Sequence, residues 1–354
     1  MEARRESVAL DMDIAPWGGQ EYLVPTSFGP ISVTVCGDLD KPALVTYPDV
    51  GLNYLSCFEG LFSCSEASSV LFHNFCIYHI DPPGHEVGAP EIPSEQEVLT
   101  ADDLADQVAE VLDYFGLDEV IGMGVTAGAY ILSLFACKYT DRALGLILVS
   151  PLSQSTSWTE WLSNQAMINI IYFCGLTGFV KERLLQRYFS SEVRDSSEST
   201  IEGLDVLTTV RHHMDDRRSE NVMRYMQAIH QRQDLTENLK NLRCRTLILV
   251  GDQSPFYHEA LHMSDTMNRR YNALIEVEGC GSLVTEERPQ SMIVPIELFL
   301  TGYAFYQPPL RSLTSSPRSP LSPLCMSAEL LSPESLGLKL KPIKTRVSSP
   351  EPEL

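Results

Sequence analysis

Residues 120–130 read VIGMGVTAGAY, an apolar run that passes through Gly124-Val125-Thr126-Ala127-Gly128 into a helical pattern. The run is typical of a buried strand, and the residues after it are typical of a buried helix. The glycines two positions either side of Thr126 indicate a sharp turn, because they let the strand and helix backbones approach closely. We therefore predict that a strand turns abruptly into a helix here, with Thr126 at the tip of the turn.

Three further segments fit the same architecture. DPPGH at 81–85 follows an apolar stretch, GDQSP at 251–255 follows another, and GCGS at 279–282 precedes EERP at 286–289. Together with the turn at Thr126 they match the D-x-x-G-H, G-D-x-D-P and G-x-G-H…E-x-P segments of α/β hydrolases. In those enzymes a nucleophile, an acid and a histidine on these segments form the catalytic triad. The sequence therefore predicts an α/β-hydrolase fold.

Each reactive position of the triad holds a different residue. The nucleophile slot holds Thr126, the acid position holds Ser254 and the base position holds Ser282. A hydroxyl is a weak nucleophile without a base beside it, and serine cannot be that base at neutral pH. Losing triad members costs on the order of 10⁴–10⁶-fold in rate in well-studied enzymes. We therefore predict a degenerate triad and no catalytic residue.

The residues around these slots define a vestigial pocket. Its predicted members are Gly124, Val125, Ala127, Gly128, Asp49 and Asp252. Asp49 lies in the segment YPDVG at 47–51, which departs from the His-Gly pair that often supplies the oxyanion region. Asp252 is interpreted as a brace of the acid loop, with a displaced catalytic acid as the alternative. His258 and His262, one helical turn apart, are interpreted as an exposed pair, with a substitute base as the alternative.

Apolar strands alternate with amphipathic helices along most of the chain. The predicted strands are Ile31–Cys36, Ala43–Tyr47, Phe75–Ile80, Val120–Gly124, Ala143–Ser150, Thr246–Gly251 and Ala273–Val277. Helices are predicted after Thr100, over 127–138, from near Phe256 and from Pro289. This alternation predicts a mostly parallel central sheet with helices on both faces.

One long insertion and two terminal segments complete the predicted organisation. Residues 152–240 contain no convincing strand, which indicates a helical cap over the carboxyl ends of the strands. Trp158 and Trp161 in this cap have two interpretations, either packing the cap onto the sheet or anchoring a partner. The hydrolase-like domain is expected to span 20–301, between a flexible N-terminus at 1–19 and a Ser/Pro-rich, disordered tail at 302–354.

The tail also carries candidate regulatory sites. It has six basic and four acidic residues, so its net charge is +2 and the remainder of the chain carries −23. Five serines precede a proline and are candidate phosphorylation sites: Ser316, Ser319, Ser322, Ser332 and Ser349. Each phosphate adds about −1.5 to −2 charges, so two would reverse the tail's sign. The alternative is an inert solubilising tail.

Charge and composition exclude several classes of function. A net charge of −21 opposes binding of nucleic acid by the bulk surface. No secretory leader and no membrane-spanning stretch is recognisable, and the nine cysteines contain no CxxC pair. We expect reduced thiols, a cytoplasmic protein and no cofactor or metal. A zinc site built from His212, His213, Asp215 and Asp216 is not favoured, because adjacent histidines on a helix diverge.

The quoted segments also resemble one family. VTYPDVGLN at 45–53, HIDPPGHE at 79–86 and GMGVTAGAY at 122–130 are similar to the N-myc downstream-regulated (NDR) family, and the Ser/Pro-rich tail resembles its plant branch. The resemblance covers roughly residues 20–302. It implies an α/β-hydrolase fold without hydrolase activity. Thr126 departs from the glycine that is common in animal members and restores a hydroxyl at the nucleophile slot.

The resemblance and the residues together lead to three hypotheses. The first is a non-enzymatic signalling adaptor. For the plant branch, the resemblance implies binding to the βγ dimer of heterotrimeric G proteins, with effects on auxin transport, growth and stress responses, and a location in the cytoplasm and, through partners, at the plasma membrane. The second is a receptor that holds a small apolar ligand in the vestigial pocket. The third is a weak esterase with a site rebuilt around Thr126.

Overall fold

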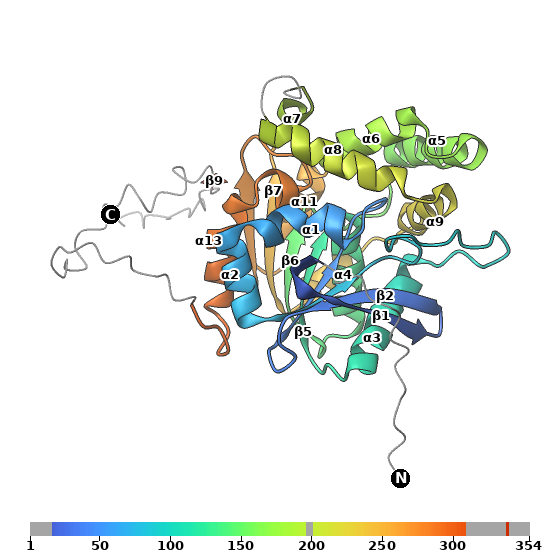
Figure 1. Cartoon of the computed structure of the whole chain (residues 1–354). Helices are drawn as coiled ribbons and strands as arrows, with labels where there is room; N and C mark the ends of the chain where they lie inside the picture. Colours follow the sequence, from blue (N-terminus) through green and yellow to red (C-terminus); the bar gives the residue numbers. More distant parts are fainter. Residues whose placement is uncertain (1–15, 196–200, 309–337, 340–354) are drawn as a thin grey trace, which may run out of the picture.

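A nine-stranded sheet forms the centre of the computed structural model, which describes residues 16–195, 201–308 and 338–339 (Figure 1). The strand order is β1-β2-β4-β3-β5-β6-β7-β8-β9. The strands are β1 (Gln20–Thr26), β2 (Gly29–Cys36), β3 (Ala43–Tyr47), β4 (Cys76–Ile80), β5 (Val120–Val125), β6 (Ala143–Val149), β7 (Arg245–Gly251), β8 (Asn272–Val277) and β9 (Leu338–Lys339). Pairing is parallel from β4 through β8 and antiparallel at the two ends of the sheet. The predicted mostly parallel sheet is confirmed.

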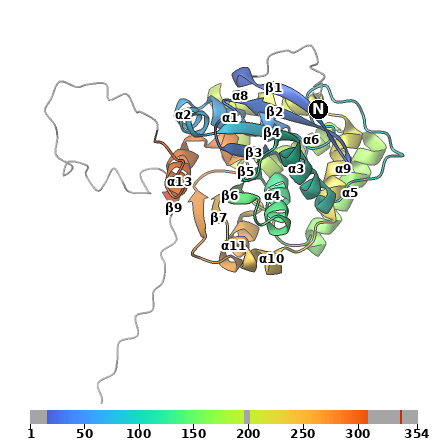
Figure 2. The ribbon, with the colours of Figure 1, turned by 90° about the horizontal axis from the view of Figure 1, so that it is seen from below.

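Helices cover both faces of this sheet, as predicted. Seen along the sheet, α1, α2 and α13 lie on one face and α3, α4 and α11 on the other (Figure 2). Their bounds are α1 (Tyr54–Ser63), α2 (Ser65–Asn74), α3 (Ala101–Phe115), α4 (Ala127–Lys138), α11 (Tyr257–Thr266) and α13 (Gln290–Leu300). The short α10 (Thr236–Asn241) contacts α11, and α12 (Val284–Glu287) contacts α1.

Local sequence explains where these elements begin and end. All five residues of β3 and all six of β5 are buried, as expected for strands covered on both faces. Thr100 caps α3 in a capping box with Asp103, and Gly116 ends the helix in the left-handed conformation. Both signals are local, and the predicted helix after Thr100 is confirmed.

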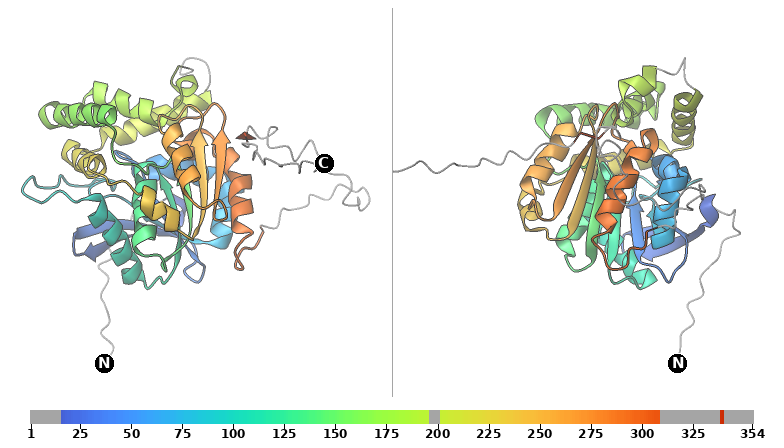
Figure 3. Two further views of the ribbon diagram at one scale, coloured as in Figure 1. Left: turned by 180° about the vertical axis from the view of Figure 1, so that it is seen from behind. Right: turned by 90° about the vertical axis from the view of Figure 1, so that its left-hand side faces the viewer.

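The predicted cap consists of helices in the described residues between β6 and β7. It contains α5 (Trp158–Cys174), α6 (Gly178–Tyr188), α7 (Ser191–Asp195), α8 (Ile201–Asp215) and α9 (Ser219–His230). It stands over the ends of the strands in both views of Figure 3. The Tyr225 hydroxyl donates to the Pro48 carbonyl at 3.2 Å, and the Tyr188 hydroxyl donates to the Val50 carbonyl. Two cap helices are therefore fastened to the loop that follows β3.

The two cap tryptophans do not pack against the sheet. Trp158 is 74% exposed and Trp161 is 40% exposed, and their rings stack on each other with centroids 5.4 Å apart. The interpretation that they hold the cap to the core is therefore wrong. The buried side of α5 is instead formed by Ile168 and Ile171.

The described residues begin slightly before the predicted domain start. Pro16–Gly18 form a short 3₁₀ helix, and the Trp17 ring lies 5.7 Å from that of Phe62 and 6.3 Å from that of Tyr54. Residues 16–19 are thus held by aromatic packing, so the predicted boundary after residue 19 is too late. Residues 1–15 lie outside the described residues.

The predicted tail also begins too early. The backbone of Gln307 is held by the side chain of Asn74 through two hydrogen bonds. The Gln307 N–H donates to Asn74 Oδ1 at 2.7 Å, and Asn74 Nδ2 donates to the Gln307 carbonyl at 3.0 Å. The predicted disorder is therefore wrong for 302–308, and also for β9, which pairs with β8. The rest of the tail lies outside the described residues, and so do the candidate phosphorylation sites Ser316, Ser319, Ser322, Ser332 and Ser349.

No helix in the described ranges is long and apolar enough to span a membrane.

Candidate functional site

The turn between β5 and α4 has the backbone of a nucleophile elbow. Thr126 has φ 47° and ψ −98°, a conformation that is costly for a β-branched residue. A Cβ on Gly124 would lie 2.6 Å from the Ala129 nitrogen, and one on Gly128 would lie 2.1 Å from the Tyr47 carbonyl oxygen. The glycines are thus required by close backbone contacts, and the flanking Val125 and Ala127 are fully buried.

Two of the three positions that are predicted to form a degenerate triad interact. The hydroxyls of Ser254 and Ser282 are 2.8 Å apart, and Ser254 also accepts the Phe256 N–H at 3.1 Å. The acid and base positions therefore still meet, as two neutral hydroxyls. The Thr126 hydroxyl is fully buried and has no hydrogen-bond partner among the described residues. In the described part of the chain, therefore, no base is hydrogen-bonded to this hydroxyl to accept its proton.

The oxyanion position is filled by a side chain of the protein itself. In α/β hydrolases the N–H that follows the nucleophile binds the substrate oxyanion. Here the Ala127 N–H donates to Asp49 Oδ1 at 3.1 Å. Asp49, on the loop after β3, is fully buried. A carboxylate thus lies where the negative charge of an ester-hydrolysis intermediate would develop.

A cap residue compensates the charge of Asp49. Arg187 of α6 donates to Asp49 Oδ2 from Nε at 2.9 Å and to Oδ1 from Nη2 at 3.1 Å. Burial alone would lower the pKa of Arg187, but the adjoining carboxylate of Asp49 raises it above its ordinary value. The two-point ion pair ties the cap to the elbow. Asp49 is among the predicted pocket residues, whereas Arg187 is not, because no sequence motif surrounds Arg187.

A cavity of about 360 Å³ lies on the cap side of this ion pair. Its apolar walls are Val50, Met167, Leu184, Met226, Ile229, Pro255 and Phe256, and its polar lining is Glu160, Ser163, Asn164, Arg183, Gln186 and Arg187. The Arg187 guanidinium stacks over the Phe256 ring at 4.4 Å. Arg187 lines the cavity, whereas Asp49 and Thr126 do not.

Of the remaining predicted side chains, Asp252 braces a loop and the two histidines do not contact Thr126. Asp252 Oδ1 accepts the Cys280 N–H at 3.3 Å, which agrees with a bracing role for this carboxylate. His258 is exposed, whereas His262 is partly buried and its Nε2 lies 3.3 Å from Gln154 Nε2. The two histidines therefore do not form the predicted exposed pair, and neither reaches Thr126.

The residues weighed for zinc serve other contacts. Asp215 pairs with Lys181 across the cap, and the rings of His212 and His213 lie 6.4 Å apart. Within the described ranges, no three His, Cys, Asp or Glu side chains gather where they could hold a metal ion.

Glu286, beside the base loop, carries a prediction about pH. The Gly60 N–H lies 3.0 and 2.9 Å from its two carboxylate oxygens, and burial raises its pKa from 4.5 to about 8. Around neutral pH the folded state therefore binds a proton that the unfolded chain releases, so this group's contribution to stability is lost as pH rises from 4.5 through 8. We expect Glu286→Gln to stabilise the protein at pH 8 relative to pH 5, measured by urea unfolding. The exposed Glu237→Gln is the control, and a pH-independent effect of Glu286→Gln would contradict the prediction.

Comparison with known proteins places the chain. The model of the Ndr family matches residues 21–307. The chain belongs to the Ndr family. It is 57% identical to the protein NDL1 of Arabidopsis thaliana over 97% of this chain and 98% of the relative. It is also 30% identical to human NDRG2, over 81% of this chain and 75% of that protein.

Solved structures show the fold of this Ndr protein. A thermophilic esterase from Thermogutta terrifontis superposes with a TM-score of 0.67 at 20% identity, covering 82% of this chain and 99% of the esterase. A hydrolase from Pseudomonas aeruginosa gives 0.66 at 17% identity, over 79% and 98% of the two chains. The predicted α/β-hydrolase fold and the predicted resemblance to plant Ndr proteins are both confirmed.

Proposed function

We propose that this Ndr protein is a non-catalytic adaptor built on an α/β-hydrolase fold. The observation that carries the proposal is the Asp49 carboxylate on the Ala127 N–H. Hydrolysis of an ester needs that donor for a developing negative charge, and a resident carboxylate both occupies it and repels the charge. The neutral Ser254–Ser282 pair supplies neither a base nor an orienting acid.

The proposed partner is the βγ dimer of heterotrimeric G proteins, through which the protein would act on auxin transport, growth and stress signalling. This assignment rests on family membership and on the 57% identity to NDL1. The net charge of −21 supports it in part, because an acidic body is drawn to basic surfaces. A cytoplasmic location, with recruitment to the plasma membrane by the partner, belongs to the same proposal.

Binding of a purified βγ dimer to the full chain tests this function. We expect saturable binding that weakens as salt is added, because salt screens attraction between the acidic body of this protein and basic side chains on the dimer. Thr126→Ala is the matched control: an adaptor should keep its affinity, since the hydroxyl is buried and unpartnered among the described residues. Absence of binding at low salt would overturn the choice of partner, while leaving the absence of catalysis to be judged separately.

A second candidate function is the binding of a small apolar molecule in the cap cavity. The supporting observation is the cavity of about 360 Å³, which falls in the range of about 300–1,000 Å³ that is usual for ligand pockets. A thermal-shift screen with small apolar metabolites should find a stabilising compound, and Met226→Trp, which fills the cavity, should abolish the shift. A library without effect, or a shift that survives Met226→Trp, would reject this candidate.

A further inference from the structure

The outer face of α5 is an exposed apolar stripe. Trp158, Trp161, Leu162, Tyr172 and Phe173 are 74, 40, 56, 68 and 79% exposed. Successive members are three, one, ten and one residues apart, which places all five on one side of the helix. At 3.6 residues per turn they fall within about a third of its circumference. The stripe has two apolar ends, and the polar Gln165 and Asn169 lie on the same side of the helix between them. Exposed apolar patches of this kind mark interaction sites in proteins.

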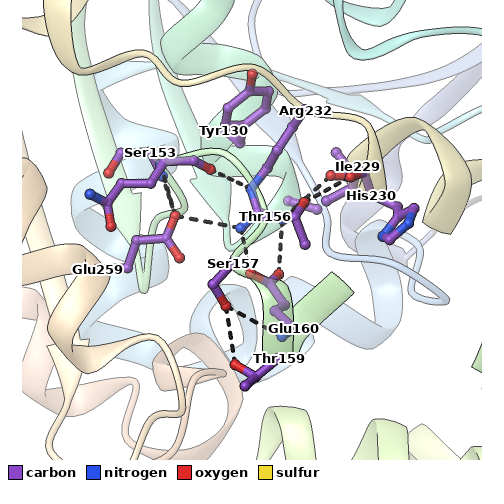
Figure 4. A network of polar contacts seen from close by, with 12 residues as sticks. Tyr130, Ser153, Thr156, Ser157, Thr159, Glu160, Ile229, His230, Arg232 and Glu259 are labelled. Atoms are coloured by element: carbon purple, nitrogen blue, oxygen red, sulfur yellow. Dashed lines mark hydrogen bonds and ion pairs between the residues drawn. The ribbon is translucent and has the colours of Figure 1, made fainter. Parts of the chain in front are cut away.

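The stripe is not needed to hold the helix in place. The rest of the circumference of α5 buries Ile168 and Ile171, and Met167 lines the cavity. Glu160 is the only charged residue of α5, and its carboxylate is turned inward onto Arg232, with Nη1 and Nη2 each 2.9 Å from a carboxylate oxygen (Figure 4). The outward side of the helix therefore carries no charge.

Charge limits what can cover the stripe. The chain carries −21, so two copies repel each other wherever their acidic surfaces approach. The α5 stripe is a surface on which two copies can meet without placing like charges together. A basic partner, in contrast, would gain nothing from a face that lacks carboxylates.

The stripe is also complementary to itself. Its aromatic residues gather at the two ends, Trp158 with Trp161 and Tyr172 with Phe173, while the uncharged Gln165 lies at the midpoint. Two antiparallel α5 helices related by a two-fold axis near Gln165 would set each tryptophan pair against the Tyr172–Phe173 pair of the other copy. Such an interface is isologous, the commonest arrangement in soluble oligomers.

The available area suits a stable dimer. With about 150–250 Å² for each large side chain, the exposed fractions amount to roughly 700 Å² per copy, close to the ~800 Å² per partner of standard interfaces. Tryptophan and tyrosine are also the residue types that dominate binding energy in interfaces. We propose that the exposed stripe of α5 is the interface of an antiparallel, two-fold symmetric homodimer.

Sedimentation equilibrium of the full chain over a wide concentration range tests the proposal. We expect a dimer that dissociates on dilution and strengthens with added salt, because salt screens the repulsion between acidic bodies. Trp158→Lys and Phe173→Glu should each give monomers, since each homodimer then buries two unpaired charges. An equimolar mixture of the two variants should form dimers again, because the lysine introduced in one chain would then face the glutamate introduced in the other. Leu298→Lys, at a 68% exposed leucine on α13, is the matched control and should remain dimeric.

Unchanged circular dichroism and melting of the variants establish that they fold, as expected for exposed positions. The proposal is overturned if the wild-type chain is monomeric at every concentration, including the case in which it binds neutral phosphatidylcholine vesicles instead. A dimer that survives Trp158→Lys, or a variant mixture that stays monomeric, also overturns it.

Discussion

Asp49→Ala is expected to lower the free energy of unfolding by about 3–5 kcal/mol, because it leaves the Arg187 charge without its buried partner. The same change leaves the buried Ala127 N–H without its acceptor. Urea unfolding of the two proteins at neutral pH measures the difference. The double variant Asp49→Asn with Arg187→Met should lose less free energy of unfolding than the sum of the losses in Asp49→Asn and in Arg187→Met alone. The reason is that the double variant removes both charges and leaves neither unpaired.

The control for Asp49 is an ion pair of similar length at the surface. Lys138 lies 3.3 Å from Asp102, whose side chain is 41% exposed. Asp102→Ala should cost at most about 1 kcal/mol, because water screens an exposed pair. If Asp49→Ala cost no more than this control, the ion pair would not be the fastening between cap and elbow.

Gly128→Ala is expected to destabilise the protein by more than about 4 kcal/mol, or to prevent recovery of folded protein. The new Cβ would lie 2.1 Å from the Tyr47 carbonyl oxygen, a backbone atom that no side-chain rotation can move away. The matched control is Gly178→Ala in the first turn of α6, where a Cβ meets nothing within 4 Å. This control should be neutral or stabilising by up to about 1 kcal/mol. Thermal melting of both variants decides the point, and equal melting temperatures would contradict the close approach of β3 and α4.

Elements with strong local signals could be predicted from the sequence. The buried strand β3 and the capped helix α3 lie where the pattern predicts them, because burial on both faces and a capping box are local properties. The edge strand β1 was missed because Val24 is its only buried residue, which leaves little apolar pattern. Helix α1 was also missed, although the capping box of Asn53 with Ser56 is a local signal that could have revealed it.

The sequence motifs predict where Thr126, Ser254 and Ser282 lie in the fold, but not which side chains surround the N–H that follows Thr126. The motifs assign Ser254 and Ser282 to two loops, and the hydroxyls of these residues meet in the structure. The motifs also predict the sharp turn at Thr126. They did not reveal that Asp49 occupies the oxyanion donor or that Arg187 neutralises it. Arg187 is 138 residues from Asp49 in the sequence, so their contact depends on how the cap docks, which no local pattern encodes.

Hydrolysis of an activated ester such as p-nitrophenyl acetate, compared between the wild-type chain and Thr126→Ala, tests the absence of catalysis most directly. The resident carboxylate and the missing base predict the same slow background rate for both proteins and no acyl group on Thr126. Turnover by the wild-type chain that is abolished by Thr126→Ala, in a variant that remains folded, would contradict this account and establish the rebuilt esterase.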